Sequence, residues 1–384
     1  MSEFVIDAIH GRINIKGFEG LIDSPEIQKL RRIKQLSFGH LVYPGANHTR
    51  FEHSLGVMHL SGLISEKLGL DKDLFMSAGL LHDVGHGPFG HASEELISFF
   101  GEKVHEKRVR RIIKNSGIRD VLKAKGLRIN KVINLINGKG RFAEIISGDL
   151  DADRMDYLSR DAYYTGNAAG VINHNVLVNM LKKKNGRVVI KSKGLFVAEH
   201  FLLARYFMFR TVYYHHVPRI ASAMMRKALM SVLKQGVISV QEFLRMDDCE
   251  VMNLLKRIPG LPGELCKRVM DRELFKRCAM IKASQARGVL KELNDLGSVE
   301  GFEDELAQRA GLKPGSVVVS MPETKECGVD ILIETSGGVR NLSQVSKFVK
   351  NLVLAEKDAL TIGVFTDKKN KKRVGKALKQ LMKK

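Results

Sequence analysis

The most informative segment of the chain is His82-Asp83-Val84-Gly85-His86-Gly87-Pro88-Phe89-Gly90-His91. Three histidines and one aspartate lie within ten residues, where glycines and a proline interrupt a helical pattern. One buried histidine has simple structural explanations, but a cluster of this density has few. Imidazole nitrogens and carboxylate oxygens together bind borderline divalent cations. The segment therefore predicts a metal centre that needs one more histidine and one more carboxylate.

Predicted helices on either side offer the missing ligands. Upstream, apolar residues recur at helical spacing over 51–69, and His53 is the first residue of this inward stripe. Downstream, a helix predicted over 141–165 places three residues on one face: Asp153, Tyr157 and Asp161. On these grounds alone the carboxylate ligand stays open among Asp149, Asp151, Asp153 and Asp156.

The order of His53, His82-Asp83 and Asp153 looks like the H…HD…D signature of HD-domain metal-dependent phosphohydrolases. Four longer blocks, at residues 6–11, 23–36, 43–54 and 153–161, resemble the HD-domain deoxynucleoside triphosphate (dNTP) triphosphohydrolases in particular. The resemblance is dense over most of residues 1–235 and elsewhere concerns only the order of elements. It implies a helical metalloenzyme that binds one divalent ion: Mn, Fe, Co, Ni or Zn, or Mg together with the triphosphate.

The resemblance also implies roles for residues near the reacting phosphate. It assigns the metal ligands to His53, His82, Asp83 and Asp153. It places four catalytic groups beside them: His86, His91, Glu94 and His105. His91 would be the general acid and Glu94 its carboxylate partner, whereas a mammalian relative has aspartate at the latter position. We expect this departure to change the pKa of the pair or the distance between its two groups.

Eight residues would contact the substrate. The resemblance implies that the α-phosphate meets Arg50 together with the catalytic His86, and that the outer phosphates meet Arg154, Tyr157 and Arg205. The sugar 3′-hydroxyl would meet Gln35, Leu36 and Asp161. Tyr213 would pack where a ribonucleotide carries its 2′-hydroxyl. Tyr214 follows it where a mammalian relative has glutamine at the base edge, so the base preference stays open.

A second nucleotide site is implied by Asp23, Gln28 and Arg31, which match a guanine-nucleotide activator pocket in a relative. Activation of that kind acts on a homo-oligomer, so we expect a dimer or a tetramer. The same block of sequence also shapes the core around the active site, which is the structural alternative for these three residues.

The chain is expected to be mostly α-helical with a small C-terminal α+β lobe. Residues 1–311 read as the phosphohydrolase core with a helical extension, and residues 312–384 as the lobe with its basic tail. We predict a hairpin between 187–190 and 195–197, followed by a long helix over 199–234 with a kink at Pro218. In the lobe, strands are expected near 316–320, 329–333 and 361–365, and helices near 342–354 and 372–381.

Composition limits the class of protein further. The formal net charge of +21 favours polyanionic partners, and residues 366–384 hold nine basic residues and one acidic residue. No apolar run is long enough to span a membrane, and no signal peptide is evident. Four scattered cysteines, Cys249, Cys266, Cys278 and Cys327, fit a reducing compartment. We therefore expect a cytoplasmic protein.

The resemblance implies hydrolysis of dNTPs to deoxynucleoside and tripolyphosphate. Such chemistry needs charge neutralisation, positioning and an activated water, which arginines and a divalent ion supply. One alternative is an HD-type phosphodiesterase or nucleotidase that acts on another phosphate ester. Another is a nucleotide-sensing or nucleic-acid-binding protein, which the basic tail favours and the intact ligand set disfavours. Single-stranded nucleic acid is the partner expected of that tail.

Overall fold

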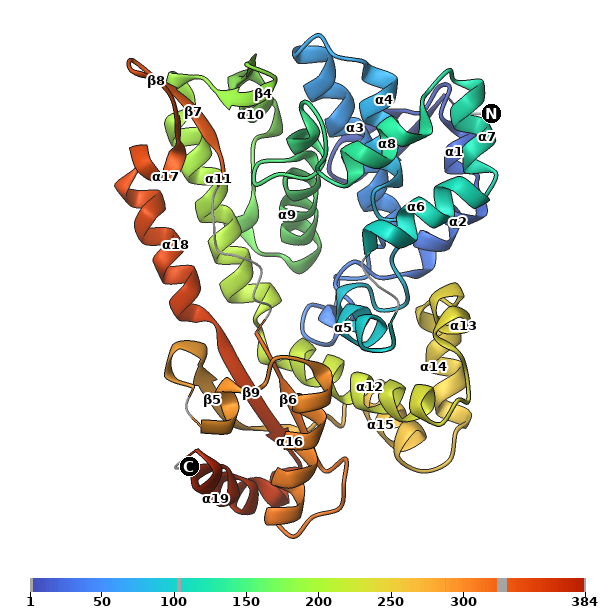
Figure 1. The fold of residues 1–384 in the computed structure, drawn as a ribbon, viewed down its shortest axis with the longest axis vertical. Helices are drawn as coiled ribbons and strands as arrows, with labels where there is room; N and C mark the ends of the chain where they lie inside the picture. Colours follow the sequence, from blue (N-terminus) through green and yellow to red (C-terminus); the bar gives the residue numbers. More distant parts are fainter. Residues whose placement is uncertain (1–2, 102–104, 287, 323–329, 383–384) are drawn as a thin grey trace.

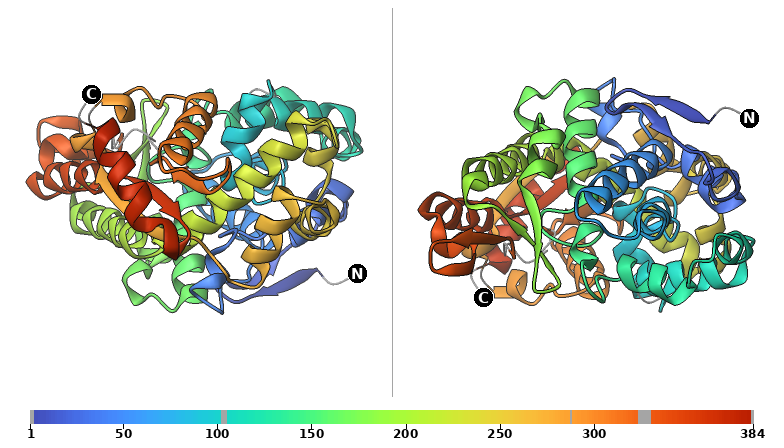
Figure 2. Two further views of the ribbon diagram at one scale, coloured as in Figure 1. Left: turned by 90° about the horizontal axis from the view of Figure 1, so that it is seen from below. Right: turned by 90° about the horizontal axis from the view of Figure 1, so that it is seen from above.

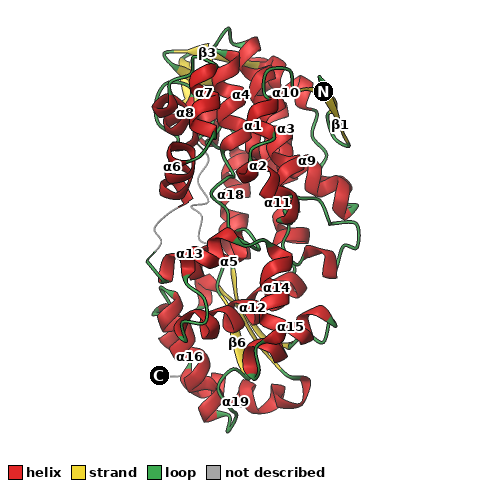
Figure 3. Ribbon diagram, turned by 90° about the vertical axis from the view of Figure 1, so that its right-hand side faces the viewer, coloured by secondary structure: helices red, strands yellow, loops and turns green. Residues whose placement is uncertain are grey.

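The computed structural model describes residues 3–101, 105–286, 288–322 and 330–382. It confirms a mostly α-helical chain with a few short strands (Figures 1 and 3). The two termini lie on opposite sides of the molecule (Figure 2). None of the helices in the described part of the chain is both long and apolar enough to cross a membrane.

Three helices form the centre of the N-terminal half: α3 (Arg50–Lys67) packs against both α4 (Lys72–Leu81) and α9 (Ala152–Thr165). The predicted helix over 51–69 is confirmed. The helix predicted over 141–165 begins later, because the Asp151 side chain accepts a hydrogen bond from the Arg154 backbone N–H and so caps α9. A short 3₁₀ turn, η3 (Ala143–Ile145), precedes that cap.

Shorter elements surround this centre. Before α3 they are β1 (Phe4–Asp7), β2 (Gly11–Asn14), α1 (Glu19–Ile22), α2 (Pro25–Lys29), η1 (Leu30–Arg32) and η2 (Gly39–Leu41). Between α4 and α9 they are α5 (His91–Phe99), α6 (His105–Asn115), α7 (Ile118–Ala124) and α8 (Ile129–Ile136). After α9 come η4 (Ala168–Gly170) and α10 (His174–Met180).

The predicted hairpin is wrong in its second half. β3 (Leu181–Lys184) pairs with β4 (Arg187–Ile190), and the turn between them is Asn185-Gly186 with φ values of 53° and 77°. Asn-Gly favours this two-residue turn because both residues tolerate positive φ. Residues 195–197 instead begin α11 (Leu195–Met208).

The long helix predicted over 199–234 is interrupted, but not at the proline. α11 continues into a π-helical turn, η6 (Phe209–Tyr213), and a new helix, α12 (His216–Lys234), follows a short break. Pro218 lies in the first turn of α12, where a missing backbone N–H costs no helical hydrogen bond. The break therefore falls beside Tyr213, at the edge of the candidate site.

The remaining helices and strands form the lower part of Figure 1 and its left edge. They are α13 (Val240–Arg245), α14 (Asp248–Arg257), α15 (Leu261–Met270), β5 (Lys276–Lys282), η7 (Ala283–Gln285), η8 (Gly288–Lys291), α16 (Leu296–Arg309), β6 (Val317–Ser320), β7 (Leu332–Thr335), β8 (Gly338–Asn341), α17 (Leu342–Val345), α18 (Lys347–Ala359), β9 (Thr361–Thr366), η9 (Lys368–Asn370) and α19 (Lys371–Leu381). The strands and helices predicted here lie close to these bounds, although part of the strand predicted over 329–333 falls outside the described residues.

Strand pairing crosses the predicted boundary at 311/312. β9 lies between β5 and β6, and β7 pairs in parallel with β4 from the first half of the chain. The division at 311/312 therefore stays a proposal about folding units. The predicted basic tail is largely a packed helix, because α19 buries Val374 and Leu378 while its lysines lie outside.

Candidate metal centre

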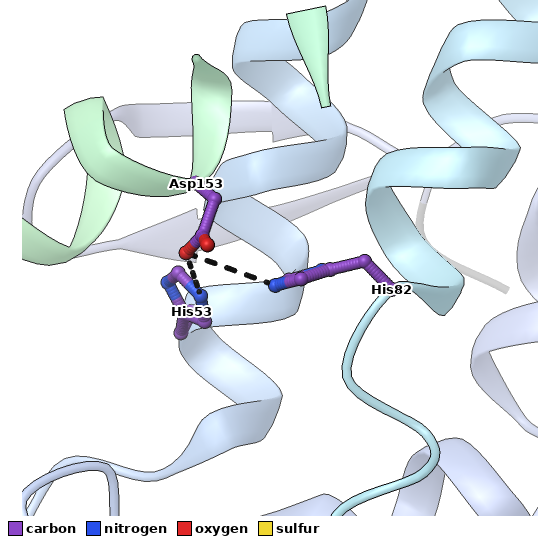
Figure 4. A group of neighbouring side chains, drawn as sticks. All are labelled: His53, His82 and Asp153. Atoms are coloured by element: carbon purple, nitrogen blue, oxygen red, sulfur yellow. Dashed lines mark ion pairs between the residues drawn. The ribbon is translucent and has the colours of Figure 1, made fainter. Parts of the chain in front are cut away.

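Three helices bring the metal-binding donors together. His53 lies in the first turn of α3, His82 directly follows α4, and Asp153 lies in the first turn of α9. Figure 4 shows the three side chains converging, with Asp153 Oδ1 3.1 Å from His53 Nε2 and 3.8 Å from His82 Nε2. One ligand atom from each lies within 4.8 Å of the others. Residues 100 positions apart in the chain thus meet at one point.

Asp83 supplies a fourth donor, the second carboxylate, next to these three. Its Oδ1 lies 3.2 Å from His82 Nε2, and its Oδ2 lies 3.9 Å from His53 Nε2. Arg50 Nη1 donates a hydrogen bond of 2.5 Å to the same Oδ2. Burial by itself would raise the pKa of Asp83, but Arg50, His82 and His86 hold it well below its usual range. Asp83 is therefore ionised, as a metal ligand must be.

Hydrogen bonds orient both histidine rings from behind. His53 Nδ1 lies 2.8 Å from Asp156 Oδ2, and His82 Nδ1 donates to the Gly79 carbonyl oxygen at 2.8 Å. The Nε2 atom of each ring therefore faces the other metal-binding donors. The Nε2 atom of His82 is buried and has no hydrogen-bond partner in the described part of the chain. Such second partners are typical of metal-binding histidines. The donor set thus fits a divalent cation.

The charge on His53 reflects the same surroundings. Burial lowers the pKa of His53, but hydrogen bonds with Asp153 and Asp156 raise it to about 10. A cation that binds to Nε2 replaces a proton there, so metal binding releases a proton.

Asp156 is held by a further layer of buried groups. Arg160 donates to both of its oxygens, at 2.8 and 2.9 Å, and the His10 ring nitrogen Nε2 lies 2.6 Å from Oδ1. Arg160 also donates to Asp7 at 2.7 Å. The sequence interpretation weighed Asp156 as a ligand and gave His10 and Arg160 no role. The only available signal was their position inside the matched sequence blocks.

The predicted pairing of Glu94 with His91 is wrong in this structure. Glu94 Oε1 lies 3.1 Å from His86 Nδ1, and Arg108 donates to both Glu94 oxygens at 2.6 and 2.7 Å. Burial by itself would raise the pKa of Glu94, but His86 and Arg108 lower it to about 2. The glycine-rich turn before α5 directs His86, rather than His91, toward this carboxylate. Arg108 lies among many basic residues of α6, so the sequence did not single it out.

His91 remains beside the site. It is exposed, and its ring meets the His86 ring edge-on, with centroids 4.9 Å apart. His105 begins α6, but its side chain lies outside the described residues. The structure thus places His86 next to Asp83 and His91 next to His86, and it leaves His105 without a described position for its ring.

The two arginines expected to hold outer phosphates meet acidic groups instead. Arg154 Nη1 lies 2.7 Å from Asp151 Oδ2, and its Nη2 lies 3.3 Å from Asp149 Oδ1. Arg205 Nη2 donates to Glu356 Oε2 at 3.4 Å, and its Nη1 lies 4.0 Å from Asp149. Glu356 comes from α18 and was not predicted, because it is far from Arg205 in the chain.

Two buried arginines, one beside Asp83 and one beside Glu356, have side-chain nitrogens without a partner among the described residues. In the described part of the chain, Arg50 Nε and Nη2 and Arg205 Nε and Nη1 have no hydrogen-bond partner. Buried donors of this kind are rarely left unsatisfied in native proteins. An anion with several oxygens, such as a polyphosphate, would satisfy them.

A hydrogen-bonded chain defines the other side of the site. Tyr213 donates from its hydroxyl to Asp161 Oδ2 at 2.7 Å, and His48 Nε2 lies 2.7 Å from Asp161 Oδ1. The Tyr157 and Tyr213 rings lie edge to face, with centroids 6.1 Å apart. Gln35 is half-buried, and its Oε1 has no hydrogen-bond partner among the described residues. His48 was missed, although it lies inside a matched block.

Leu36 packs at the edge of the main core, next to Gln35 in the chain.

The three residues proposed for an activator lie away from the metal cluster in sequence and already have structural contacts. Arg31 Nε donates to Gln28 Oε1 at 2.8 Å, and its guanidinium lies 3.5 Å from the centroid of the Phe51 ring. Asp23 is exposed at the end of α1.

A helical fold that converges two histidines and two aspartates beside buried arginines defines a metal-dependent phosphohydrolase. Comparison with known proteins agrees. Residues 50–161 match the HD domain, and residues 172–383 match the HD associated region. The chain therefore belongs to the HD-domain phosphohydrolases with an HD-associated region.

Individual relatives cover most of the chain. It is 32% identical to an uncharacterised protein of Methanocaldococcus jannaschii, over 98% of this chain and 83% of that protein. A deoxynucleoside triphosphate triphosphohydrolase SAMHD1 homologue of Dictyostelium discoideum is 30% identical over 72% of this chain and 60% of its own length. The crystal structure of a phosphohydrolase from Bacteroides thetaiotaomicron superposes with a TM-score of 0.76 at 26% identity, covering 96% of this chain and all of that one.

Proposed function

We propose that the protein hydrolyses deoxynucleoside triphosphates to deoxynucleosides and tripolyphosphate. One observation carries the proposal: a single face of α9 presents Asp153 to the metal cluster, Tyr157 to the Tyr213 ring, and Asp161 to the Tyr213 hydroxyl. Along this one helix, a metal ligand is therefore followed by an aromatic ring and then by a carboxylate that could bind a sugar hydroxyl. The similarity to the Dictyostelium triphosphohydrolase supports the same substrate class.

The residues divide the reaction between them. A divalent ion held by His53, His82, Asp83 and Asp153 would neutralise phosphate charge and lower the pKa of bound water. Arg50, fixed by Asp83, would direct its free nitrogens at the α-phosphate. In this proposal water attacks the α-phosphorus, the bond from phosphorus to the 5′-oxygen breaks, and His91 protonates that oxygen.

The remaining polar groups position the substrate. Glu94 and Arg108 hold His86, whose Nε2 lies 3.2 Å from Asp83 Oδ1. On the proposed sugar side, Tyr213 is fixed through Asp161. A ring packed against the sugar would reject a 2′-hydroxyl sterically, which discriminates more strongly than an apolar pocket alone.

The test is to incubate Mn²⁺-loaded protein with each dNTP and each ribonucleotide, and to separate tripolyphosphate from pyrophosphate and phosphate. The expected products are deoxynucleoside and tripolyphosphate, with ribonucleotides hydrolysed more slowly. Formation of monophosphate and pyrophosphate would favour the alternative phosphodiesterase chemistry. An Asp83→Ala variant controls for contaminating phosphatases.

We further propose activation by guanine nucleotide at Asp23, Gln28 and Arg31, acting on a homo-oligomer. An activator must bind the active assembly better than the inactive one, with typical coupling of about 5–150-fold. Adding GTP should then accelerate hydrolysis of a second dNTP and increase the mass seen by light scattering. Arg31→Ala should abolish both responses without changing the metal content. Rate and mass both indifferent to GTP would assign the three residues to the scaffold alone.

A further inference from the structure

Among the described residues, Glu356 is the one carboxylate near Arg154 and Arg205 that has no evident structural task. Asp151 caps α9, and Asp149 Oδ2 accepts a hydrogen bond of 2.6 Å from the Asp330 backbone N–H. Glu356, in contrast, has Arg205 as its hydrogen-bond partner within the described residues and no other. Its side chain is only 11% exposed. Burying a carboxylate is costly, so this contact calls for a reason beyond fold stability.

The position of Glu356 is fixed by the rest of α18. Figure 1 shows α18 running alongside α11, and the two helices are in contact. Ser346 caps α18 and donates from its hydroxyl to Glu199 of α11 at 2.5 Å, while Val349 is buried in the main core. These contacts hold the beginning of α18 against α11. Glu356, two to three turns further along, then faces Arg205.

Arg205 is available for exchange. It is a buried residue, 8% exposed, yet two of its nitrogens have no hydrogen-bond partner among the described residues, and its contact with Glu356 is long at 3.4 Å. Phosphate oxygens make shorter and more numerous bonds to a guanidinium than one distant carboxylate does. A polyphosphate that reaches Arg205 must therefore displace Glu356 or suffer its repulsion.

We propose that Glu356 is a specificity-determining residue that competes with the outer phosphates for Arg205. In the enzyme without substrate, the Glu356 carboxylate occupies the place of a phosphate beside Arg205. After hydrolysis it pairs with Arg205 again and thereby favours dissociation of tripolyphosphate. A ligand too short to reach Arg205 does not meet this competition. The inference rests on the proposed function, because Arg205 is assigned there to the outer phosphates.

The experiment measures binding of inorganic tripolyphosphate by calorimetry, with Mn²⁺ saturating both protein and ligand. Glu356→Gln removes the charge with little change in shape. A contact of this strength should be worth about three- to tenfold in affinity. We therefore expect the Kd for tripolyphosphate and the KM for a dNTP to fall by that factor, with a smaller change in kcat. The Kd of the deoxynucleoside should not change.

Asp358→Asn is the matched control, because it makes the same change on the same helix at a fully exposed ion pair with Lys282. It should leave both constants as in the wild type. Glu356→Asp keeps the charge and should have a smaller effect than Glu356→Gln. A Kd for tripolyphosphate that is unchanged or higher in Glu356→Gln overturns the inference, as does a wild-type protein that does not bind tripolyphosphate.

The same measurements separate this inference from the proposed function. Hydrolysis of dNTPs by the wild type, together with an unaltered Kd in Glu356→Gln, removes only the role of Glu356. Tighter tripolyphosphate binding in Glu356→Gln, without any dNTP hydrolysis by the wild type, removes only the proposed reaction.

Discussion

The two sides of the candidate site are held in different ways. On the metal side, His53 and His82 are fixed by Asp156 and by the Gly79 carbonyl oxygen. On the proposed phosphate side, Arg205 is held loosely by a carboxylate at 3.4 Å. The hydrogen bonds behind His53 and His82 hold the metal-binding nitrogens in place before a cation binds. The loose contact of Arg205 allows a phosphate to replace the carboxylate. The difference suggests a site that is rigid where the reaction occurs and exchangeable where product leaves.

The most damaging change to the rigid side is loss of a metal ligand. His82→Ala or Asp83→Ala should remove the bound cation and abolish hydrolysis, because ligand loss exceeds the ~10–100-fold cost of changes behind the ligands. Metal content by mass spectrometry and the circular dichroism spectrum check the prediction together. Full metal occupancy in both folded variants would remove them from the ligand set.

A change on the sugar side should alter selectivity rather than metal content. Tyr213→Ala opens the space proposed for a 2′-hydroxyl, so the ratio of dNTP to NTP hydrolysis should narrow, by more than the ~10–200-fold that an apolar pocket alone provides if the wild type discriminates sterically. Tyr213→Phe is the control, because it keeps the ring and loses only the hydrogen bond to Asp161. Equal ratios in wild type and Tyr213→Ala would exclude this tyrosine from sugar selection.

The contact of Glu94 with His86 and Arg108 should appear as a pH-dependent contribution to stability. The pKa of Glu94 is about 2 in the fold against an ordinary 4.5, so its stabilisation is present above pH 4.5 and is lost as the pH falls through about 2. Glu94→Gln should therefore lower the free energy of unfolding at pH 7 by about 1–3 kcal/mol. Urea unfolding of both proteins between pH 7 and pH 3 tests this.

Two results would contradict that account. One is a stability difference between wild type and Glu94→Gln that stays constant down to pH 3. The other is an equal loss in Glu66→Gln, which removes the charge of a fully exposed glutamate paired with Lys72.

The smallest expected effect concerns α19. Because its apolar face is buried, deleting the segment would damage the core, so the charge has to be changed instead. The triple variant Lys372→Glu, Lys376→Glu and Lys379→Glu alters exposed positions only. If α19 binds single-stranded nucleic acid, the log–log salt dependence should flatten by about 0.7 per lost phosphate contact. An unaltered slope would leave these lysines as a solvated face, and dNTP hydrolysis should be unaffected in either case.

The metal side could be predicted because its signals are local. His82 and Asp83 are adjacent, and the helical stripe that begins at His53 shows which way that residue faces. On the phosphate side the resemblance indicated Arg205, but its partner Glu356 could not be predicted, since the two residues are 151 positions apart and no local periodicity reports such a contact. Glu94 was assigned to the wrong histidine for a related reason. Spacing on α5 favoured His91, whereas the turn before α5 presents His86.

The central claim is that water attacks the α-phosphorus and the 5′-oxygen leaves. Its most direct test is hydrolysis of a dNTP in H₂¹⁸O by the Mn²⁺-loaded protein, with both products analysed by mass spectrometry. The account predicts one ¹⁸O atom in tripolyphosphate and none in the deoxynucleoside. Label in the deoxynucleoside, or label divided between a nucleotide and a shorter phosphate, would contradict it.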